Sequence, residues 1–393
     1  MNVYITGIGI ISAIGFDVQE NYYSLKEKKS GIGKLKFLPS DKDVLAGEVK
    51  LSDNALIRKC NLIHSPYSRT SLLGIAAATE AWGNNVLTDD LRTGIISATS
   101  VGGMDQTENY YRQVLEYGYA DSSLIRTHDS GNTTEKIARQ LGITGYINTL
   151  STACSSGANA IMLGARMLEQ NKIDRILVGG SDSLTQFTIK GFHSLMIYDG
   201  QWCKPFDENR NGLNLGEGAA FLLLENQNSI IKTKNNIYCR ISGWHNAADA
   251  FHQTASSPEG KGATLAMKQA LVKAGISPDD VSYINAHGTG TKNNDASESA
   301  ALKNIFGNNI PAFSSTKAYT GHTLAAAGAI EAVYSVLAIQ NDVVLPNINF
   351  TQPIAETELI PQTEFRKINN VNSVLSNSFG FGGNNTSLVF TKN

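Results

Sequence analysis

Short apolar runs bounded by glycine, asparagine or serine alternate with longer helical stretches along the first half of the chain. These runs have the length and composition of buried strands, and they are Val3–Ile8, Gly94–Thr99, Arg175–Gly179 and Ala219–Leu224. Strands that alternate with helices predict an α/β fold.

The second half repeats this alternation after a polar stretch at residues 225–236. Its expected strands are Val281–Ala286, Pro311–Ser314, Val371–Ser376 and Ser387–Phe390. We therefore expect two similar halves, an N-terminal one of residues 1–232 and a C-terminal one of residues 233–393.

One strand–turn–helix unit occurs in both halves. A strand at Ile147–Thr152 leads to a helix at Ala158–Gln170, and a strand at Ala312–Thr316 leads to a helix at Leu324–Ile339. Both helices are apolar on nearly every side, which predicts that they are buried and fill a layer between two sheets. The second helix is short for a membrane span and contains Glu331, so we expect no membrane association.

The composition narrows the classes of protein. Lys and Arg number 33 against 35 Asp and Glu, so the net charge of −2 gives no general attraction for nucleic acid or an anionic membrane. Only 17% of the residues are charged, which favours extensive burial, partly against a second copy. The four cysteines lack zinc-type spacing and the N-terminus lacks a basic signal-peptide region, so we expect no metal site and a cytoplasmic location.

Cys154 stands where an expected strand gives way to a helix, in the sequence Ser-Thr-Ala-Cys-Ser-Ser-Gly. Backbone N–H groups and the positive end of a helix stabilise a thiolate, so we expect the thiol pKa to lie below about 8.5 and Cys154 to be a nucleophile. The alternative is an inert buried cysteine, the commoner fate of a lone Cys. Cys60, Cys203 and Cys239 have no comparable context and are expected to be inert.

Two histidines follow equivalent strands of the second half. His287 is surrounded by small residues that leave room for a ligand, and Thr289 and Thr291 offer hydroxyls to a polar, amide-bearing one. His322 stands at the head of the second apolar helix. Either histidine alone favours a structural role, but a cysteine and two histidines at equivalent strand-to-helix exits favour an active site.

Glu331 lies inside that apolar helix and needs a partner for its charge, for which Lys317 is the nearest candidate. The C-terminal segment Asn377–Asn385 carries three glycines and two phenylalanines. Such a loop can present a backbone N–H to an oxyanion and swing an aromatic ring as a gate. The alternative is an ordinary glycine-rich hairpin connection.

Taken together, these segments resemble the β-ketoacyl-[acyl-carrier-protein] synthase family over almost the whole chain. Thr152–Gly157 resembles its nucleophile turn, Asn285–Thr291 its first histidine motif, and Lys317–Gly328 its lysine and second histidine motif. The resemblance implies a thiolase-like five-layer αβαβα sandwich and a condensing acyltransferase. Such an enzyme joins malonyl-carrier protein to an acyl chain held on the cysteine, with loss of CO₂.

The resemblance also implies roles for individual residues. Cys154 is expected to carry the acyl chain, with the backbone N–H groups of Cys154 and Phe381 as oxyanion donors. His287 and His322 are expected to bind the malonyl enolate, and Lys317 and Glu331 to organise the histidines.

The remaining expected roles concern binding and access. Thr289, Thr291 and Phe379 are expected to contact the substrate, while Phe381 with Gly380 gates the acyl pocket and Asp295 lies near the moving loops. The carrier's thioester supplies the activation, so no metal or redox cofactor is expected.

Acyl carrier protein is the expected partner, together with a second copy in a homodimer or a chain-length factor in a heterodimer. Carrier proteins of this type are acidic, and Arg58, Lys59 and Arg69 are the candidates for a basic docking patch. The alternative for these three is a solvated helix face.

Departures from the common pattern of the family leave more than one biosynthetic pathway possible. Lys204 stands where arginine is usual, Gly290 where fatty-acid elongases often have serine, and the segment between Phe192 and Pro205 is short. A specialised type II polyketide or aryl-polyene synthase is therefore the alternative to fatty-acid elongation. A thiolase is disfavoured because no cysteine follows Cys239, and a non-catalytic chain-length partner would lack the nucleophile.

Overall fold

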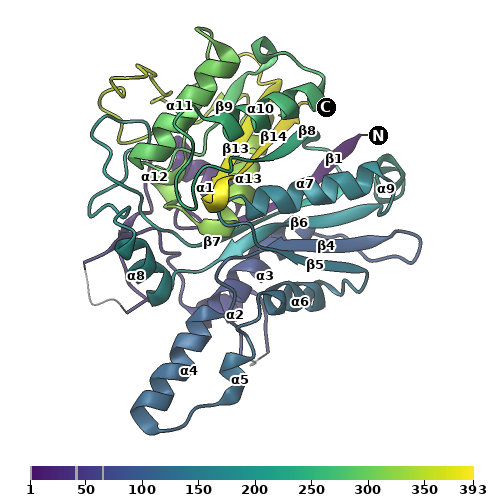
Figure 1. The fold of residues 1–393 in the computed structure, drawn as a ribbon. Coiled ribbons are helices and arrows are strands. Elements are labelled where there is room, and N and C mark those ends of the chain that lie inside the picture. The colour runs from purple at the N-terminus through teal and green to yellow at the C-terminus, as the bar shows by residue number, and fades with distance from the viewer. Residues whose placement is uncertain (1, 40–42, 64–65) are drawn as a thin grey trace.

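The computed structural model describes residues 2–39, 43–63 and 66–393. Its main feature is a ten-stranded sheet that runs through the molecule (Figure 1). The strands of the N-terminal half, in sheet order, are β5 (Tyr146–Leu150), β4 (Thr93–Ala98), β6 (Arg175–Asp182), β7 (Gly218–Glu225) and β1 (Val3–Ser12). Those of the C-terminal half are β10 (Phe313–Ser314), β9 (Tyr283–Asn285), β13 (Ser373–Gly380), β14 (Asn384–Thr391) and β8 (Cys239–Ala248).

The two halves of this sheet have the same topology. In each half three strands are parallel, β5-β4-β6 and β10-β9-β13, and two further strands join antiparallel, β7-β1 and β14-β8. The halves meet where β1 pairs with β8 through Val3–Ile5 and Cys239–Ile241. The predicted α/β, thiolase-like sandwich of two similar halves is confirmed, with its two sheets continuous at this seam.

Side chains that alternate along the strands divide the interior into layers, because successive residues of a strand point to opposite faces. Ile95 and Leu177 pack toward the outer helices of the N-terminal half, whereas Ile96 and Val178 pack toward the central helices. The outer helices are α3 (Arg69–Trp82) and α6 (Ser130–Leu141) on one side and α10 (Lys261–Ala274) and α11 (Lys292–Phe306) on the other. The central layer holds α7 (Ser156–Glu169) and α13 (Ala327–Asn341).

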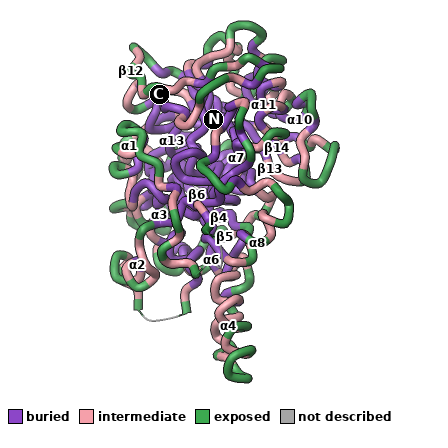
Figure 2. Tube along the Cα trace, turned by 90° about the vertical axis from the view of Figure 1, so that its left-hand side faces the viewer, coloured by how far each residue is buried: buried purple, intermediate pink, exposed green. Residues whose placement is uncertain are grey.

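The two central helices touch through glycines. A Cβ on Gly157 would lie 2.8 Å from the backbone of Ala325 and Ala329, and one on Gly328 would lie 2.8 Å from the backbone N of Ala158. Residues 324–341 form a helical stretch long and apolar enough to cross a membrane, but 89% of it is buried inside the protein. This stretch is the buried core helix that the sequence predicts, as the buried centre of Figure 2 shows.

The remaining elements surround this framework. Helices α4 (Met104–Tyr117) and α5 (Ser122–Ile125) form an arm that projects from the body (Figure 1). Further helices are α1 (Val18–Lys26), α2 (Asp53–Lys59), α8 (Gln186–Ser194), α9 (Gln227–Thr233) and α12 (Lys317–Thr320), with 3₁₀ turns η1 (Pro278–Asp280), η2 (Leu324–Ala326) and η3 (Phe381–Gly383). Two small ribbons pair β2 (Gly33–Lys34) with β3 (Leu45–Ala46) and β11 (Val343–Val344) with β12 (Arg366–Lys367). The expected boundary between residues 232 and 233 falls at the end of α9 and stays a prediction.

Candidate active site

Cys154 lies in a tight turn between β5 and α7. Ala153, just before it, has a left-handed backbone (φ 54°), which is uncommon for a residue with a side chain. Ser156 closes the turn, because its Oγ accepts a hydrogen bond from the N–H of Thr152 at 2.7 Å and donates to the carbonyl of Ala153 at 2.5 Å. The strained turn places Cys154 just before Ser155, the N-cap of α7, so the predicted strand-to-helix exit is confirmed.

Three asparagines from both halves of the protein brace this turn. Asn159 of α7 and Asn246 of β8 donate hydrogen bonds to Oδ1 of Asn384 in β14, at 2.8 and 2.7 Å, and Ser155 donates to the same oxygen at 2.7 Å. The sequence does not predict this network, because no local pattern marks amide side chains that meet only after the two halves pack.

The sulfur environment differs from the expected one. Burial raises the pKa of Cys154 to about 11, although the Lys317 ammonium and the backbone N–H groups of Phe381 and Cys154 oppose that rise. The prediction of a lowered thiol pKa is therefore wrong, because the cost of desolvating a thiolate outweighs the Lys317 charge and the two N–H groups. The same two N–H groups act on the sulfur, and these are the groups expected to serve as oxyanion donors.

His287 is held as a neutral N–H donor. Its Nδ1 lies 3.1 Å from Nζ of Lys317, which also donates to the carbonyl of His287 at 2.6 Å. An ammonium group can only donate, so Nδ1 accepts and the ring proton is on Nε2. Burial and the Lys317 charge hold the pKa of His287 well below 6.5, which keeps the ring neutral.

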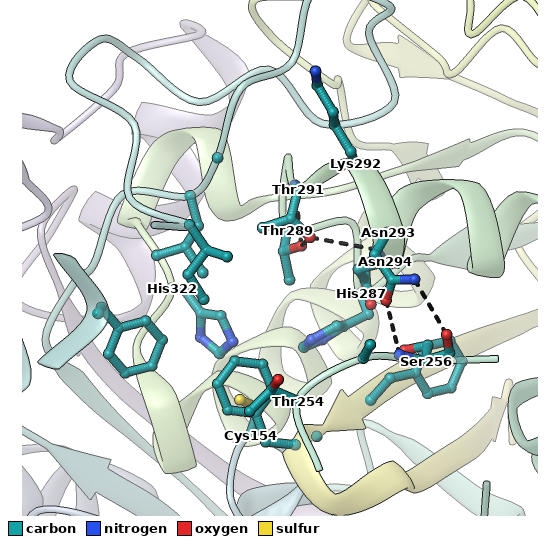
Figure 3. Close-up of a pocket in the computed structure, with 18 of the residues that line it drawn as sticks. Cys154, Thr254, Ser256, His287, Thr289, Thr291, Lys292, Asn293, Asn294 and His322 are labelled. Atoms are coloured by element: carbon teal, nitrogen blue, oxygen red, sulfur yellow. Dashed lines mark hydrogen bonds between the residues drawn. The ribbon is translucent and has the colours of Figure 1, made fainter. Parts of the chain in front are cut away.

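His322 has the same tautomer for a different reason. The backbone N–H of Leu324 donates to its Nδ1 at 3.1 Å, so the ring proton is again on Nε2. Burial and the Lys317 charge hold the pKa of His322 well below 6.5. The rings of His287 and His322 are nearly perpendicular with centroids 5.4 Å apart, and both lie beside Cys154 (Figure 3). The site thus offers two neutral imidazole donors beside a thiol.

Buried carboxylates support this arrangement. The expected pair of Lys317 and Glu331 is confirmed, since the two side chains form a hydrogen-bonded ion pair and are 3% and 2% exposed. Glu298 of α11 accepts hydrogen bonds from the N–H groups of His287 and Gly288 at 2.9 and 2.8 Å. Glu298 is not among the predicted site residues. Its only signal in the sequence is that it is an acidic residue among the small side chains of a helix.

A cavity of about 380 Å³ lies in front of Cys154 (Figure 3). It is lined by both histidines and by the expected binding and gate residues Thr289, Thr291, Phe379, Gly380 and Phe381. The Phe381 ring stacks on Phe192 of α8, with centroids 6.0 Å apart, and the Phe379 ring lies 5.9 Å from that of His287. The expected gate segment is also the turn between β13 and β14. Its backbone is therefore the glycine-rich hairpin connection that is the alternative interpretation of this segment.

The structure places Asp295 behind the pocket and not at the gate. Its carboxylate is completely buried and accepts hydrogen bonds from the N–H groups of Phe206 at 2.7 Å and Gly290 at 3.2 Å. Those contacts hold the turn that carries Thr289 and Thr291. Asp295 lies in the first turn of α11, and its hydrogen bonds join it to Phe206 and Gly290 and not to Gly380 or Phe381, so its expected place among the gate residues is wrong. That it lies near moving loops stays a prediction.

The predicted carrier-protein patch is wrong for Arg69. Its guanidinium is buried in ion pairs with Glu217 and Asp53, both at 2.6 Å, so it is not available to an acidic partner. Arg58 and Lys59 are exposed at the end of α2, and neither lines the pocket. The exposed cationic side chain among the pocket-lining residues is Lys292, which the sequence analysis did not select.

Comparisons with known proteins agree with this geometry. Residues 1–229 match the family model "Beta-ketoacyl synthase, N-terminal domain", and residues 238–351 match "Beta-ketoacyl synthase, C-terminal domain". The chain is 34% identical to 3-oxoacyl-[acyl-carrier-protein] synthase 2 of Staphylococcus aureus (strain MRSA252), covering 100% of this chain and 98% of that protein. It is 36% identical to the protein of the same name from Synechocystis sp., covering 99% and 98%.

Solved structures show the same likeness. The ishigamide ketosynthase/chain length factor superposes with a TM-score of 0.93 at 29% identity, covering 100% of this chain and 99% of that chain. A ketosynthase, ApeO, in complex with its chain length factor, ApeC, from Xenorhabdus doucetiae gives 0.86 at 32% identity, covering 100% and 98%. Matches over the full length, together with the cysteine and the two neutral histidines in one pocket, show that the chain is a condensing acyltransferase and belongs to the β-ketoacyl synthase family.

Proposed function

We propose that this enzyme extends an acyl chain held on Cys154 by two carbons, through decarboxylative condensation with malonyl-[acyl-carrier-protein]. The observation that carries the proposal is the pair of Nε2–H imidazoles beside one buried thiol. Two neutral donors stabilise an enolate without protonating it, and that is the intermediate formed when a malonyl thioester loses CO₂.

In the first half-reaction the Cys154 sulfur attacks the thioester carbonyl of an acyl-carrier protein. The thioester oxygen becomes negative and accepts hydrogen bonds from the N–H groups of Cys154 and Phe381. The bond to the pantetheine sulfur breaks, and the thiol proton of Cys154 ends on that leaving sulfur. The acyl chain is then bonded to Cys154, and free carrier leaves.

In the second half-reaction malonyl-carrier protein occupies the same pocket, with Thr289 and Thr291 against its pantetheine arm. Cleavage of the bond to the carboxylate releases CO₂ and leaves its electrons in the enolate, whose oxygen accepts hydrogen bonds from His287 and His322. The enolate carbon attacks the acyl carbonyl on Cys154, the bond to sulfur breaks, and the Cys154 sulfur leaves as a thiolate. It takes up one proton from solvent, which balances the carboxylate charge lost when CO₂ forms. The product is a 3-oxoacyl-carrier protein.

The thioester supplies the activation for both half-reactions, so we propose that the enzyme needs no metal or redox cofactor. Phe381 would act as the gate, because its ring stacks on Phe192 and both rings line the cavity in front of Cys154. We place the reaction in the cytoplasm.

Fatty-acid-type elongation is the main proposal, supported by the full-length likeness to 3-oxoacyl-[acyl-carrier-protein] synthases. The second candidate is a type II polyketide or aryl-polyene ketosynthase that works with a chain-length factor. The observation that favours it is the superposition on ketosynthases solved with such factors.

A partner chain is supported by the edge of the sheet. Among the described residues, strand β5 pairs with β4 and has no strand on its other side, and its Tyr146 and Ile147 are 39% and 41% exposed. An unpaired strand edge with apolar side chains is suited to pairing with another chain. We propose that β5 and the projecting arm contact either a second copy, in a homodimer, or a chain-length factor.

The test is a chain-length and unsaturation series of acyl-carrier proteins. Incubation should add one acyl mass, located on Cys154, and malonyl-carrier protein should then release CO₂ and a product two carbons longer. The Cys203→Ser variant is the matched control, because Cys203 is also buried but does not line the pocket, and it should acylate normally. Absence of any adduct across the series would contradict the proposal. Mass measurement of the native assembly, alone and with a co-expressed chain-length factor, decides the partner.

A further inference from the structure

Asp182 ends β6 and is completely buried without lining the pocket. Within the described part of the chain, its carboxylate accepts hydrogen bonds from the hydroxyl of Thr99, and from the N–H groups of Ser100 and Val101 at 3.0 Å and of Ala325 at 2.8 Å. A carboxylate accepts four such bonds only when it is ionised. Burial raises its pKa to about 6 against the opposing effect of these donors, so Asp182 is charged at neutral pH.

The bond to Ala325 anchors the turn beside His322. Leu324, the preceding residue, has a left-handed backbone (φ 52°), which costs a branched residue free energy and persists only where neighbours enforce it. That conformation directs the N–H of Leu324 to Nδ1 of His322. The Leu324 side chain packs in one apolar cluster with Val101, whose N–H is held by the same carboxylate.

We propose that Asp182 is a positioning residue for the decarboxylation half-reaction: by holding the 324–325 turn, it keeps His322 in the tautomer that donates from Nε2. This inference rests on the proposed function. Asp182 has no proposed contact with the substrate and no proposed part in the acylation of Cys154.

The chemical consequence of losing the anchor follows from the two tautomers of imidazole. If the Leu324 N–H turns away from Nδ1, the ring proton is free to move to Nδ1, and Nε2 then presents a lone pair to the enolate oxygen. A lone pair facing a negative oxygen repels it, whereas loss of a single oxyanion donor lowers a rate by about 10²–10³. If the wrong tautomer is only partly populated, the rate of CO₂ release should fall less, on the order of 10- to 100-fold.

The test is Asp182→Asn in the full-length enzyme. The amide has nearly the same volume, but its NH₂ group must face N–H donors, so the anchor weakens. We expect kcat for CO₂ release from malonyl-carrier protein to fall about 10- to 100-fold, with KM unchanged within about twofold. The rate at which acyl-carrier protein acylates Cys154 should stay within about threefold of the parent.

Asp174→Asn is the matched control. Asp174 is a buried carboxylate just before the other end of the same strand, where it pairs with Arg92, so its loss should destabilise the protein without touching His322. If Asp182→Asn does not fold, Thr99→Val removes one donor from the same carboxylate and should lower kcat for CO₂ release about two- to fivefold.

Three results are distinguishable. Equal losses in acylation and CO₂ release for Asp182→Asn, or an unchanged kcat for CO₂ release, would overturn the positioning role. Failure of the parent enzyme in both half-reactions would refute the proposed function instead. A selective loss of CO₂ release in Asp182→Asn, absent from Asp174→Asn, supports the inference.

Discussion

The thiol of Cys154 should stay protonated throughout the neutral range and therefore react slowly with alkylating reagents. Its pKa is raised to about 11, chiefly by burial, and a raised thiol pKa means that the reactive thiolate forms only as the pH approaches that value. At pH 8 the thiolate fraction is then about 10⁻³, against about a quarter for an ordinary cysteine of pKa about 8.5. From the thiolate fraction alone, alkylation of Cys154 at pH 8 should therefore be up to roughly 200-fold slower than that of a free thiol, and the greater nucleophilicity of a high-pKa thiolate offsets part of this factor.

The assay is the rate of iodoacetamide modification, followed at the Cys154 peptide by mass spectrometry between pH 6.5 and 10. Because a closed gate slows the reaction equally at every pH, the slope is more informative than the absolute rate. We expect the logarithm of the rate to rise by about one unit per pH unit without levelling off. A plateau at or below pH 8.5 would refute the reasoning, because it would show that the helix end and the backbone N–H groups outweigh burial.

Further predictions concern catalysis and packing. The variants His287→Ala and His322→Ala should acylate nearly normally but release CO₂ from malonyl-carrier protein about 10²–10³ times more slowly. Loss of acylation with decarboxylation intact would show that the two half-reactions are assigned the wrong way round. Lys317→Met should likewise lower CO₂ release about tenfold or more, because Nδ1 of His287 loses its donor; an unchanged rate would contradict the tautomer assignment. Gly328→Ala should lower the free energy of unfolding by about 1–3 kcal/mol in urea titrations, since its Cβ would meet the backbone of α7. Gly191→Ala is the control, because Gly191 has open space around it in α8, and this variant should not lower the free energy of unfolding.

The sequence predicts much of this fold because its strands and central helices are buried. Continuous apolar runs identify such elements without any knowledge of the partners, and the strand–turn–helix unit around Cys154 recurs at Lys317. The pairing of Lys317 with Glu331 was also predictable, since a charge inside an apolar helix requires a counter-charge nearby.

What the sequence could not provide depends on distant contacts. Arg69 and Glu217 lie 148 positions apart, so nothing near Arg69 indicates that its charge is buried. The pKa of Cys154 depends on how completely the packed halves exclude water, which a local motif does not report. The anchor between Asp182 and Ala325 likewise joins two segments that are adjacent only in the folded protein.

The central claim is tested most directly by a single turnover of enzyme carrying an acyl chain on Cys154, mixed with malonyl-carrier protein labelled with ¹³C at all three malonyl carbons. We expect one labelled CO₂ per acyl chain consumed, and a carrier-bound 3-oxoacyl product that contains the original chain and the two other labelled carbons. Release of the acyl chain as a free acid, with the malonyl group intact, would contradict it.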